Sequence, residues 1–593
     1  MLLRRTLVSG FFLAATALSG TAGAFPGFYA YKGKKPANLS THVILMKRDA
    51  TTVVTVMPDY EGDLKPFVVV MPVPDDVKAT DARSLKREFV ERIDEISAPR
   101  FHEFWEMDPC EPGEAQQEWQ RDLSVKSGAG FLGMDFGGDQ SGEDQPKFKP
   151  SKEMHLAVDP EFKEGEEAFS LIPASAAANI EGVLKAKGYT SPEGTNQAVA
   201  PYVKAGMQFL VTEVDTKKME LVGSDRAIVS PIRYSTNKSV DVDSTLGLLN
   251  LEDGGKQEEF IYVIHPDQRF EVKNYPNVFP PTNVEVDFKV KERIGEFYAG
   301  LHDLLLKKQP LGVLNEFAWP TKGCGQPCAT EPLLINELLT LGADVFEQAL
   351  PKAVREPKAP DMTDDEKKAF ADIKDKKKKK EIEEMRKEGE RRKQLIARHF
   401  YVLTRLHHRY DKTTLTKDFE IGPASPIHGG VDIPTGPQGT LPMDVKPAAD
   451  NQFQVRFTSF HQSPAIAHCD KPERWRWGKA PRTYLGLRKI WLAQDTATKN
   501  RTSYKPADLV YTPIPDLGLA GKPELQGGIA EVRSFGPAPS ASASADAGAG
   551  TAGGKAKGTC GCEIPGRRAS DSRPLFGALA ALGLTRLRRR RTS

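Results

Sequence analysis

Short runs of β-branched and aromatic residues dominate the first part of this sequence, and they constrain its fold more than any other feature. They lie at 41–48, 51–57 and 67–73, and turn residues at 59–63 separate the last two. Runs of this length and composition, bounded by turns, predict neighbouring antiparallel strands. An amphipathic helix is predicted next, at 84–97, because apolar residues recur there at helical spacing.

Helices and strands continue to mix along the chain without a regular repeat. Helices are predicted at 175–187, about 196–205 and about 293–306, and strands at 207–214, 258–264 and 269–275, the last two as a hairpin. A doubly wound parallel sheet needs strands and helices in regular alternation, which is absent here. We therefore expect an α+β fold: a mixed, mainly antiparallel sheet with helices packed against it.

The first 24 residues carry the pattern of a targeting segment. Two arginines at positions 4 and 5 precede an apolar stretch from Leu7 to Leu18, and small residues follow at 22 and 24. This order is typical of a cleaved signal peptide, and the apolar stretch is too short for a membrane-spanning helix. We expect residues 1–24 to be removed and the mature chain to begin near Phe25.

The other end of the chain carries a second targeting pattern. Residues 536–559 are rich in Gly, Ala, Ser and Pro and predict a disordered, flexible linker. Cys560 and Cys562 follow, then an uncharged run from Pro574 to Thr585 and a terminal arginine cluster. Because basic residues stay on the cytoplasmic side, such a segment would enter an inner membrane with its cysteines outside. The alternative is a disulfide between Cys560 and Cys562 followed by a disordered basic tail.

This order of cysteine, apolar stretch and terminal arginines resembles the myxosortase-dependent sorting tail known as MYXO-CTERM. The resemblance implies that 560–593 is a sorting and anchoring tail in which Cys560 or Cys562 receives a lipid. It further implies that a peptidase removes 574–591. Attachment to a membrane through a processed, lipidated C-terminus, contact with export and sorting peptidases, and a location at the outer envelope or cell surface follow as expectations.

Composition places the body of the chain among ordinary globular proteins. The chain is 39% hydrophobic and 27% charged, with a formal net charge of +2, and this balance predicts no nucleic-acid partner. A glycine-rich acidic stretch at 127–150 predicts a disordered insertion. A second insertion at 363–393 has ten acidic and thirteen basic residues, which predicts a long charged surface helix with i,i+4 ion pairs.

Several ordered segments of the body match the pattern of a known family. They are "AFPGFYAYK" at Ala24, "VVTVMPDYEGDLKPFVVVMPVP" at Val53, "KGYTSPEGTNQAVAPYVKAGMQFLVTEVD" at Lys187, "NYPNVFPPTNVEV" at Asn274, "EFAWPTKGCGQPCATEPLLINELLTLG" at Glu316 and "YVLTRLHHRYD" at Tyr401. Together they resemble the domain of unknown function 2330 family of exported bacterial proteins. The resemblance covers 25–425 and extends toward "CDKPERWRWG" at Cys469, so we expect 426–535 to form the C-terminal part of the body. It implies no known activity and no catalytic residues.

The cysteines of the body offer one candidate for chemistry. They are Cys110, Cys324, Cys328 and Cys469. In an exported chain we expect disulfides, and four cysteines allow three pairings, which the sequence leaves open. Cys324 and Cys328 precede a predicted helix at 333–341, as reactive thiol pairs do. Their spacing is one residue longer than in a Cys-X-X-Cys pair and 330–332 separates them from the helix, so a structural disulfide is favoured over redox catalysis.

Two further motifs have a functional and a structural interpretation. "HHRYD" places His407 and Asp411 four residues apart, on one face of a predicted helix, which makes them weak candidates for metal ligands. A zinc site needs three or four ligands, so we predict a solvated helix end and no metal. "RWRWG" places Trp475 and Trp477 at alternate positions, which suits stacking on a surface glycan or one face of a packed strand.

We therefore expect an exported, surface-anchored protein of unknown biochemical activity that binds or supports other envelope components. Envelope proteins and a surface glycan are the partners considered, and no cofactor or catalytic residue is predicted. The alternative is an envelope enzyme, either a thiol-disulfide oxidoreductase that uses Cys324 and Cys328 or a metal-dependent one. The sequence has no phosphate-binding loop, no zinc-protease motif and no serine-hydrolase motif.

Overall fold

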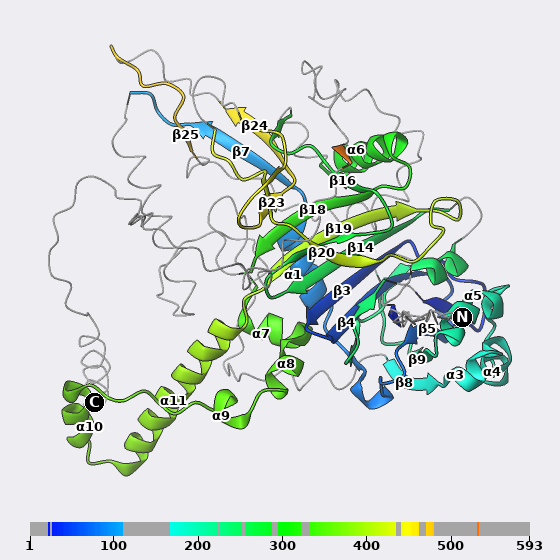
Figure 1. Ribbon diagram of the computed structural model, residues 1–593, viewed down its shortest axis with the longest axis horizontal. Coiled ribbons are helices and arrows are strands. Elements are labelled where there is room, and N and C mark those ends of the chain that lie inside the picture. The colour runs from blue at the N-terminus through cyan, green and yellow to red at the C-terminus, as the bar shows by residue number, and fades with distance from the viewer. Residues whose placement is uncertain are drawn as a thin grey trace, which may run out of the picture. The chain divides into compact units, whose positions relative to one another are not determined.

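The computed structural model has the α+β fold that the sequence predicts (Figure 1). It describes residues 22–23, 27–110, 167–221, 226–242, 244–251, 255–286, 294–321, 333–434, 441–461, 470–478 and 531–532. The chain divides into two compact units. The first comprises Met1–Phe346 and His399–Ala538, and the second comprises Glu347–Arg398 and Pro539–Ser593.

A sheet of 14 strands dominates the first unit. Its order is β10 (Glu220–Leu221), β11 (Arg226–Ile228), β4 (Thr51–Glu61), β3 (Ser40–Arg48), β14 (Gln257–His265), β19 (Val402–Tyr410), β18 (Val313–Pro320), β23 (Gln452–Gln454), β21 (Ile427–Gly429) and β22 (Lys446–Pro447). The strands off this path are β12 (Ile232–Thr236), β6 (Arg83–Ser84), β16 (Asn277–Phe279) and β26 (Glu531–Val532). Most pairs are antiparallel, but β14 runs parallel to β3.

Smaller sheets account for the remaining strands. One four-stranded sheet has the order β2 (Phe28–Tyr31), β5 (Phe67–Val73), β9 (Gln208–Val214) and β8 (Glu167–Ile172). Another has the order β17 (Val284–Glu285), β24 (Arg456–His461), β7 (Arg100–Glu106) and β25 (Trp477–Gly478). The two-stranded sheets are β15 (Arg269–Val272) with β20 (Ile421–Ala424), and β1 (Ala22–Gly23) with β13 (Val240–Asp241).

The strand predictions succeed for location and partly fail for pairing. β3 and β4 are antiparallel neighbours, as expected from 41–48 and 51–57. β5, at 67–73, lies in a different sheet, so its predicted place beside β4 was wrong. The predicted hairpin of 258–264 with 269–275 was also wrong, because both edges of β14 are already occupied by β3 and β19 and β15 pairs with β20 instead.

The helices predicted between residues 84 and 306 form, with shifts at their ends. They are α1 (Glu88–Ser97), α3 (Ala174–Ala177), α4 (Ile180–Ala186), α5 (Thr195–Lys204) and α6 (Ile294–Lys308), with 3-10 turns η1 (Ala79–Asp81) and η3 (Ser244–Asn250). The helix predicted at 175–187 is divided between α3 and α4. Asn179 interrupts it, because its side chain caps α4 by accepting a hydrogen bond from Gly182 N.

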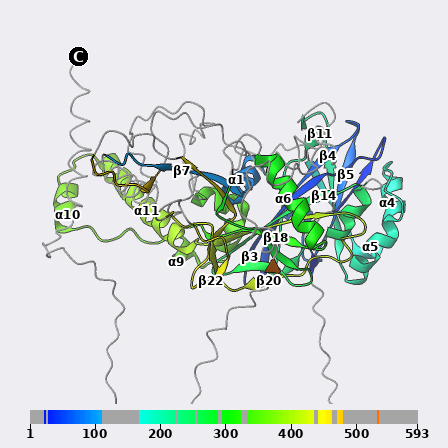
Figure 2. The ribbon, with the colours of Figure 1, turned by 90° about the horizontal axis from the view of Figure 1, so that it is seen from above.

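In the described residues, two apolar clusters form the core. The larger gathers side chains of β3, β4, β14 and β19 with those of β2, β5, β9 and the helices α3 to α5. The smaller packs α6 against β18, β16 and β24, and the turned view shows α6 beside β18 (Figure 2). Side chains alternate between the two faces of a strand, so Ile261, Val263 and Leu406 enter the larger cluster. Their neighbours in sequence, including Tyr262, Arg405 and His407, face the other way.

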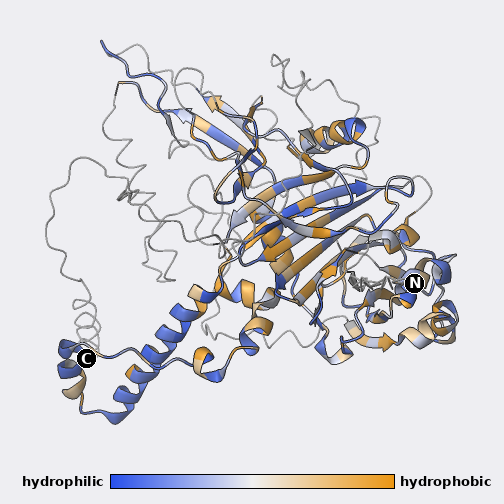
Figure 3. Ribbon diagram, viewed as in Figure 1, coloured by the Kyte–Doolittle hydropathy of each residue, from blue (hydrophilic) through white to orange (hydrophobic). Residues whose placement is uncertain are grey.

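The first segment of the first unit, which ends at Phe346, closes with α7 (Ile335–Leu338) and the π-helical turn η5 (Leu339–Ala343), and α8 (Asp344–Gln348) crosses the boundary between the units. The second unit holds α9 (Lys352–Arg355), α10 (Asp364–Ala371) and α11 (Lys376–Arg398). The predicted charged helix at 363–393 is thus two helices. Thr363 and Glu366 form a capping box that starts α10. α11 is almost entirely hydrophilic (Figure 3).

Candidate functional site

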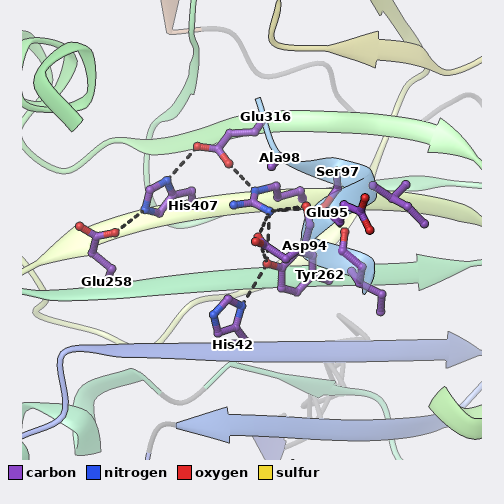
Figure 4. Close-up of polar contacts among 12 residues, drawn as sticks. His42, Asp94, Glu95, Ser97, Ala98, Glu258, Tyr262, Glu316 and His407 are labelled. Carbon is purple, nitrogen blue, oxygen red and sulfur yellow. Dashed lines mark hydrogen bonds and ion pairs between the residues drawn. The ribbon is translucent and has the colours of Figure 1, made fainter. Parts of the chain in front are cut away.

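A row of ionisable side chains crosses one face of the central strands (Figure 4). We call it the charge network. Its members, in order, are Asp94, Arg405, Glu316, His407, Glu258, Arg409 and Asp303. Acidic and basic groups alternate along the whole row, so that each cation lies between two carboxylates.

Strand geometry places most of these side chains. Arg405, His407 and Arg409 occupy every second position of β19 and therefore share one face. Glu316 comes from β18, beside a break in register between Asn315 and Phe317 that is typical of a β-bulge. Asp94, from α1, Glu258, from β14, and Asp303, from α6, complete the row.

Arg405 is the centre of one half of the network. Its Nε donates to Glu316 Oε2 at 2.5 Å, and its Nη1 donates to Asp94 Oδ1 and to the Tyr262 hydroxyl. The Tyr262 hydroxyl donates to Asp94 Oδ1 at 2.8 Å. That hydroxyl has one proton, so His42 Nδ1, 3.1 Å away, is a donor to it. Burial lowers the pKa of His42 to about 4, which keeps its ring neutral.

His407 is the centre of the other half. Its Nδ1 lies 2.8 Å from Glu316 Oε1 and its Nε2 lies 3.3 Å from Glu258 Oε2. Carboxylates only accept hydrogen bonds, so both ring nitrogens donate and the ring is an imidazolium. Burial lowers the pKa of His407, but the two carboxylates outweigh burial and raise it above its ordinary value. Arg409 then joins Glu258, at 2.7 Å, to Asp303, at 2.5 Å.

The network is closed to solvent except at one end. The side chains of Arg405, Glu316 and His407 are at most 1% exposed, whereas the Asp303 side chain is 36% exposed. Burial alone would raise the pKa of Glu316, but the charges of His407 and Arg405 lower it to about 2. Isolated charges do not persist at such depth, so the alternation of sign is what allows these groups to stay ionised.

His302 lies beside the network without joining it. Its ring is fully buried, and neither nitrogen has a hydrogen-bond partner among the residues that the structure describes. The ring packs edge-on against His407 with centroids 4.3 Å apart. Burial, and the neighbouring positive charge of His407, hold the pKa of His302 well below its ordinary value. It therefore borders the imidazolium as a neutral group.

Histidine paired with a carboxylate is the usual equipment for general acid–base catalysis, but such a site must reach a substrate. Here both nitrogens of His407 are already bound, and its side chain is almost fully buried. The arrangement fixes α1, β14, β18 and β19 together through charge-assisted hydrogen bonds, which are stronger than neutral ones. In this arrangement the charge network stabilises the fold.

The proposed metal pair is not on a helix. Residues 402–410 form β19, and all nine are buried, so the predicted solvated helix end was wrong. His407 belongs to the charge network, while Asp411 lies beyond the strand and caps a turn by accepting from Thr413 N and Thr414 N. In the described parts of the chain, no group of three or more His, Cys, Asp or Glu side chains is arranged to hold a metal ion.

The two tryptophans of "RWRWG" have separate environments. Trp477 lies in β25 and is 6% exposed, with its ring against Phe460. Trp475 is half-buried and has a φ of 67°, and the Arg474 guanidinium lies 4.7 Å from its ring centre. The interpretation as a packed strand fits Trp477, and the two rings, inclined at 36°, do not form a flat stacking platform.

Most of the cysteines lie outside the described residues, as do both targeting segments except Ala22–Gly23, which form β1 beside β13. This applies to Cys324, Cys328, Cys469, Cys560 and Cys562, to the predicted insertion at 127–150 and to the linker and tail beyond 536. Cys110, at the end of the segment that follows β7, is disulfide-bonded. Among the residues that the structure describes, no helix has the length and apolar character that a membrane crossing requires.

The charge network was not predicted from the sequence. Its members other than His407 were not predicted as site residues, namely Asp94, Glu258, Asp303, Glu316, Arg405 and Arg409, and His407 was predicted only as a weak candidate for a metal ligand. One signal was present: "VLTRLHHRY" has strand-like alternation of its basic residues. Those residues would be expected on a solvated face, and their acidic partners lie on four other elements far away in sequence, α1, β14, α6 and β18.

Three comparisons relate the chain to known proteins. A family model described as "Uncharacterized protein conserved in bacteria (DUF2330)" matches residues 20–422. No curated protein matches. Among solved structures, a crystal structure of baculovirus P35 is similar with a TM-score of 0.21 and 11% identity, over 42% of this chain and 75% of that one. A structural similarity this low supports no argument about fold or function.

Proposed function

The chain belongs to the DUF2330 family of bacterial proteins, and from that premise we propose that it is an exported envelope protein whose body binds or supports other envelope components. In this proposal the body is a stable, non-catalytic module. The signal peptide predicted at 1–24 delivers it, the linker at 536–559 separates it from a surface, and the tail at 560–593 attaches it.

The closed charge network is the observation that carries the non-catalytic part of the proposal. It brings together four groups with shifted pKa values, Glu316, Arg405, His407 and Arg409, and such gatherings are where catalysis is usually sought. Every acid and base of the network is paired within it, and only the carboxylate of Asp303 reaches solvent appreciably. Its groups are therefore committed to holding strands and helices together.

The attachment part of the proposal rests on the two ends of the sequence. A flexible linker of the composition found at 536–559 has an average span on the order of 25 Å, enough to hold the body clear of a surface. Lipidation at Cys560 or Cys562 would then place the protein at the outer envelope or cell surface. One acyl chain gives only marginal membrane binding, so a second attachment is required.

Mass spectrometry of the protein extracted from its native envelope tests this proposal. The extract is alkylated before any reduction, and the same chain made without export serves as the control. We expect the native chain to begin near Phe25, to end close to Cys560 or Cys562 and to carry added acyl mass. A native chain that keeps both 1–24 and 574–593 would refute export and anchoring together.

A second portion of the same extract, alkylated after mild reduction, tests the alternative that the protein is a thiol-disulfide oxidoreductase. A structural disulfide between Cys324 and Cys328 resists mild reductant, whereas a redox-active pair is reduced and its low-pKa thiol is alkylated rapidly. We expect the two cysteines to remain unmodified until strong reductant and denaturant are present. Rapid alkylation of Cys324 after mild reduction would favour the oxidoreductase instead.

A further inference from the structure

The beginning of α11 concentrates positive charge where a helix tolerates it least. Lys376–Lys380 are five consecutive lysines, and the first turn of the helix contains no acidic residue. The N-terminal end of a helix already carries a partial positive charge, so basic side chains there oppose helix formation. Asp375 compensates in part, because its side chain accepts a hydrogen bond from Lys377 N at 2.9 Å. Helix stability alone therefore does not account for this sequence.

One face of α11 has no acidic residue. With 3.6 residues per turn, Lys378, Ile382, Met385, Gly389 and Lys393 fall along one side of the helix. We call this side the basic-apolar face. The five acidic residues of α11 all project from the rest of its circumference: Glu381, Glu383, Glu384, Glu388 and Glu390. Basic residues lie on every side of α11, but on this side no acidic residue offsets them.

The basic-apolar face is open within the second unit. Met385 is 60% exposed, the highest value among the large exposed apolar side chains of the described residues. Lys378 and Lys393 are exposed, and neither forms an ion pair with a residue that the structure describes. The preceding chain covers an adjacent side of the helix instead: Arg386 donates to Pro360 O at 2.7 Å, and Lys379 lies 5.2 Å from the centre of the Phe370 ring.

We propose that the basic-apolar face of α11 docks on an anionic lipid surface. This inference rests on the proposed function, because a single acyl chain needs a second attachment to hold a protein on a membrane. Basic residues near an anionic leaflet supply such an attachment, with about a fivefold gain in binding for each lysine. Met385 and Ile382 supply apolar side chains that can enter the interface between headgroups and acyl chains, as amphipathic surface helices do.

Vesicle co-sedimentation with the full-length mature chain, made without lipidation, tests the docking. Vesicles of neutral phosphatidylcholine are compared with vesicles that contain anionic phosphatidylglycerol, at low and at high salt. We expect binding to the anionic vesicles only, and a decrease as salt rises because the attraction is screened. The variant Lys378→Glu/Met385→Ser is expected to bind at least about tenfold more weakly.

Lys387→Glu is the matched control, because it makes the same charge change at an exposed position among the acidic residues of the same helix. It is expected to bind almost as well as the unmodified chain. Equal losses of vesicle binding in the two variants would refute the basic-apolar face as the docking surface and would show that binding depends only on net charge. Binding of a soluble anionic polysaccharide without binding of anionic vesicles would also refute the lipid surface.

The two proposals fail in different experiments. The vesicle assay uses a chain with no acyl group, so its outcome does not depend on processing of the tail. If native protein lacks acyl mass but the purified chain binds anionic vesicles through α11, anchoring by the tail is refuted and docking by α11 stands. If native protein is acylated and the purified chain ignores anionic vesicles, docking by α11 is refuted and the proposed function stands.

Discussion

Replacing Arg405 with methionine is the sharpest test of the charge network. Arg405 bridges Asp94 and Glu316, and all three side chains are at most 4% exposed. Methionine has a similar length and no charge, so Arg405→Met leaves the carboxylates of Asp94 and Glu316 buried without the cation that bridges them, and Glu316 keeps only its pair with His407. Removing one partner of a buried ion pair typically destabilises a protein by about 3–5 kcal/mol. We expect a loss of free energy of unfolding in this range.

A triple variant tests whether charge or shape causes the loss of stability. It adds Asp94→Asn and Glu316→Gln to Arg405→Met, which removes the two carboxylate charges and keeps the side-chain volumes. We expect this triple variant to recover about 2 kcal/mol of the loss, because neutral amides are much cheaper to bury than unpaired carboxylates. Lys238→Met is the control. It breaks an exposed pair with Asp75 in the same unit and is expected to cost at most about 1 kcal/mol.

Urea unfolding at neutral pH, followed by circular dichroism and tryptophan fluorescence, measures these differences. The slope with denaturant must stay constant among the variants for the midpoints to be compared. A loss below about 1 kcal/mol for Arg405→Met would show that the buried ions contribute little to stability. A triple variant no more stable than Arg405→Met would show that lost packing, not stranded charge, explains the effect.

Three other outcomes follow from the structure. His407 has a raised pKa in the folded state, so the stability that its charge contributes is complete below the ordinary pKa of 6.5 and is lost as the pH rises through the higher folded pKa. The difference in free energy of unfolding between the unmodified chain and His407→Gln, measured with urea, should therefore narrow from pH 6 to pH 9. A difference that widens would contradict the imidazolium. Gly342→Ala is expected to lower the free energy of unfolding by at least about 2 kcal/mol, measured by thermal unfolding, because φ is 149° and a Cβ would lie 2.8 Å from a valine side chain. At Gly389 a Cβ would meet nothing within 4 Å, so Gly389→Ala should not destabilise α11. Peptide mapping without reduction should find Cys110 in a disulfide. We expect its partner to be Cys469, because the segment after Cys469 pairs with the end of β7. A free Cys110 thiol would contradict the disulfide, and a different partner would contradict the pairing with Cys469.

Local pattern sufficed to predict much of the fold. The apolar runs at 41–48 and 51–57 form β3 and β4, and the spacing of Ile294, Phe297 and Leu301 predicts α6 within two residues at each end. Pairing across long distances in sequence was not predictable in the same way. β14 takes β3 and β19 as neighbours, and nothing local to 257–265 indicates that both its edges are filled before β15 can join.

The charge network was missed for a physical reason. The usual assumption puts arginine and histidine on solvated faces, and that assumption turned the alternating basic residues of 402–410 into a surface helix end. The strand is buried on both sides because carboxylates from α1, β14 and β18 neutralise it. Asp94 and Arg405 are 311 residues apart in sequence, so their contact is visible only once the fold is known.

The parallel pairing of β3 with β14 also governs how this chain must fold. Ser40 of β3 lies opposite Glu258 of β14. In another sheet β7 also pairs in parallel with β24, where Arg100 lies opposite Arg456. Closing loops of such length costs entropy before any contact compensates it, so chains with distant pairings fold slowly. The N-terminal strands cannot complete their sheets until most of the polypeptide has been made. A chain that must cross a membrane before folding would gain from this delay, since its central sheet stays open until the last partner strands arrive.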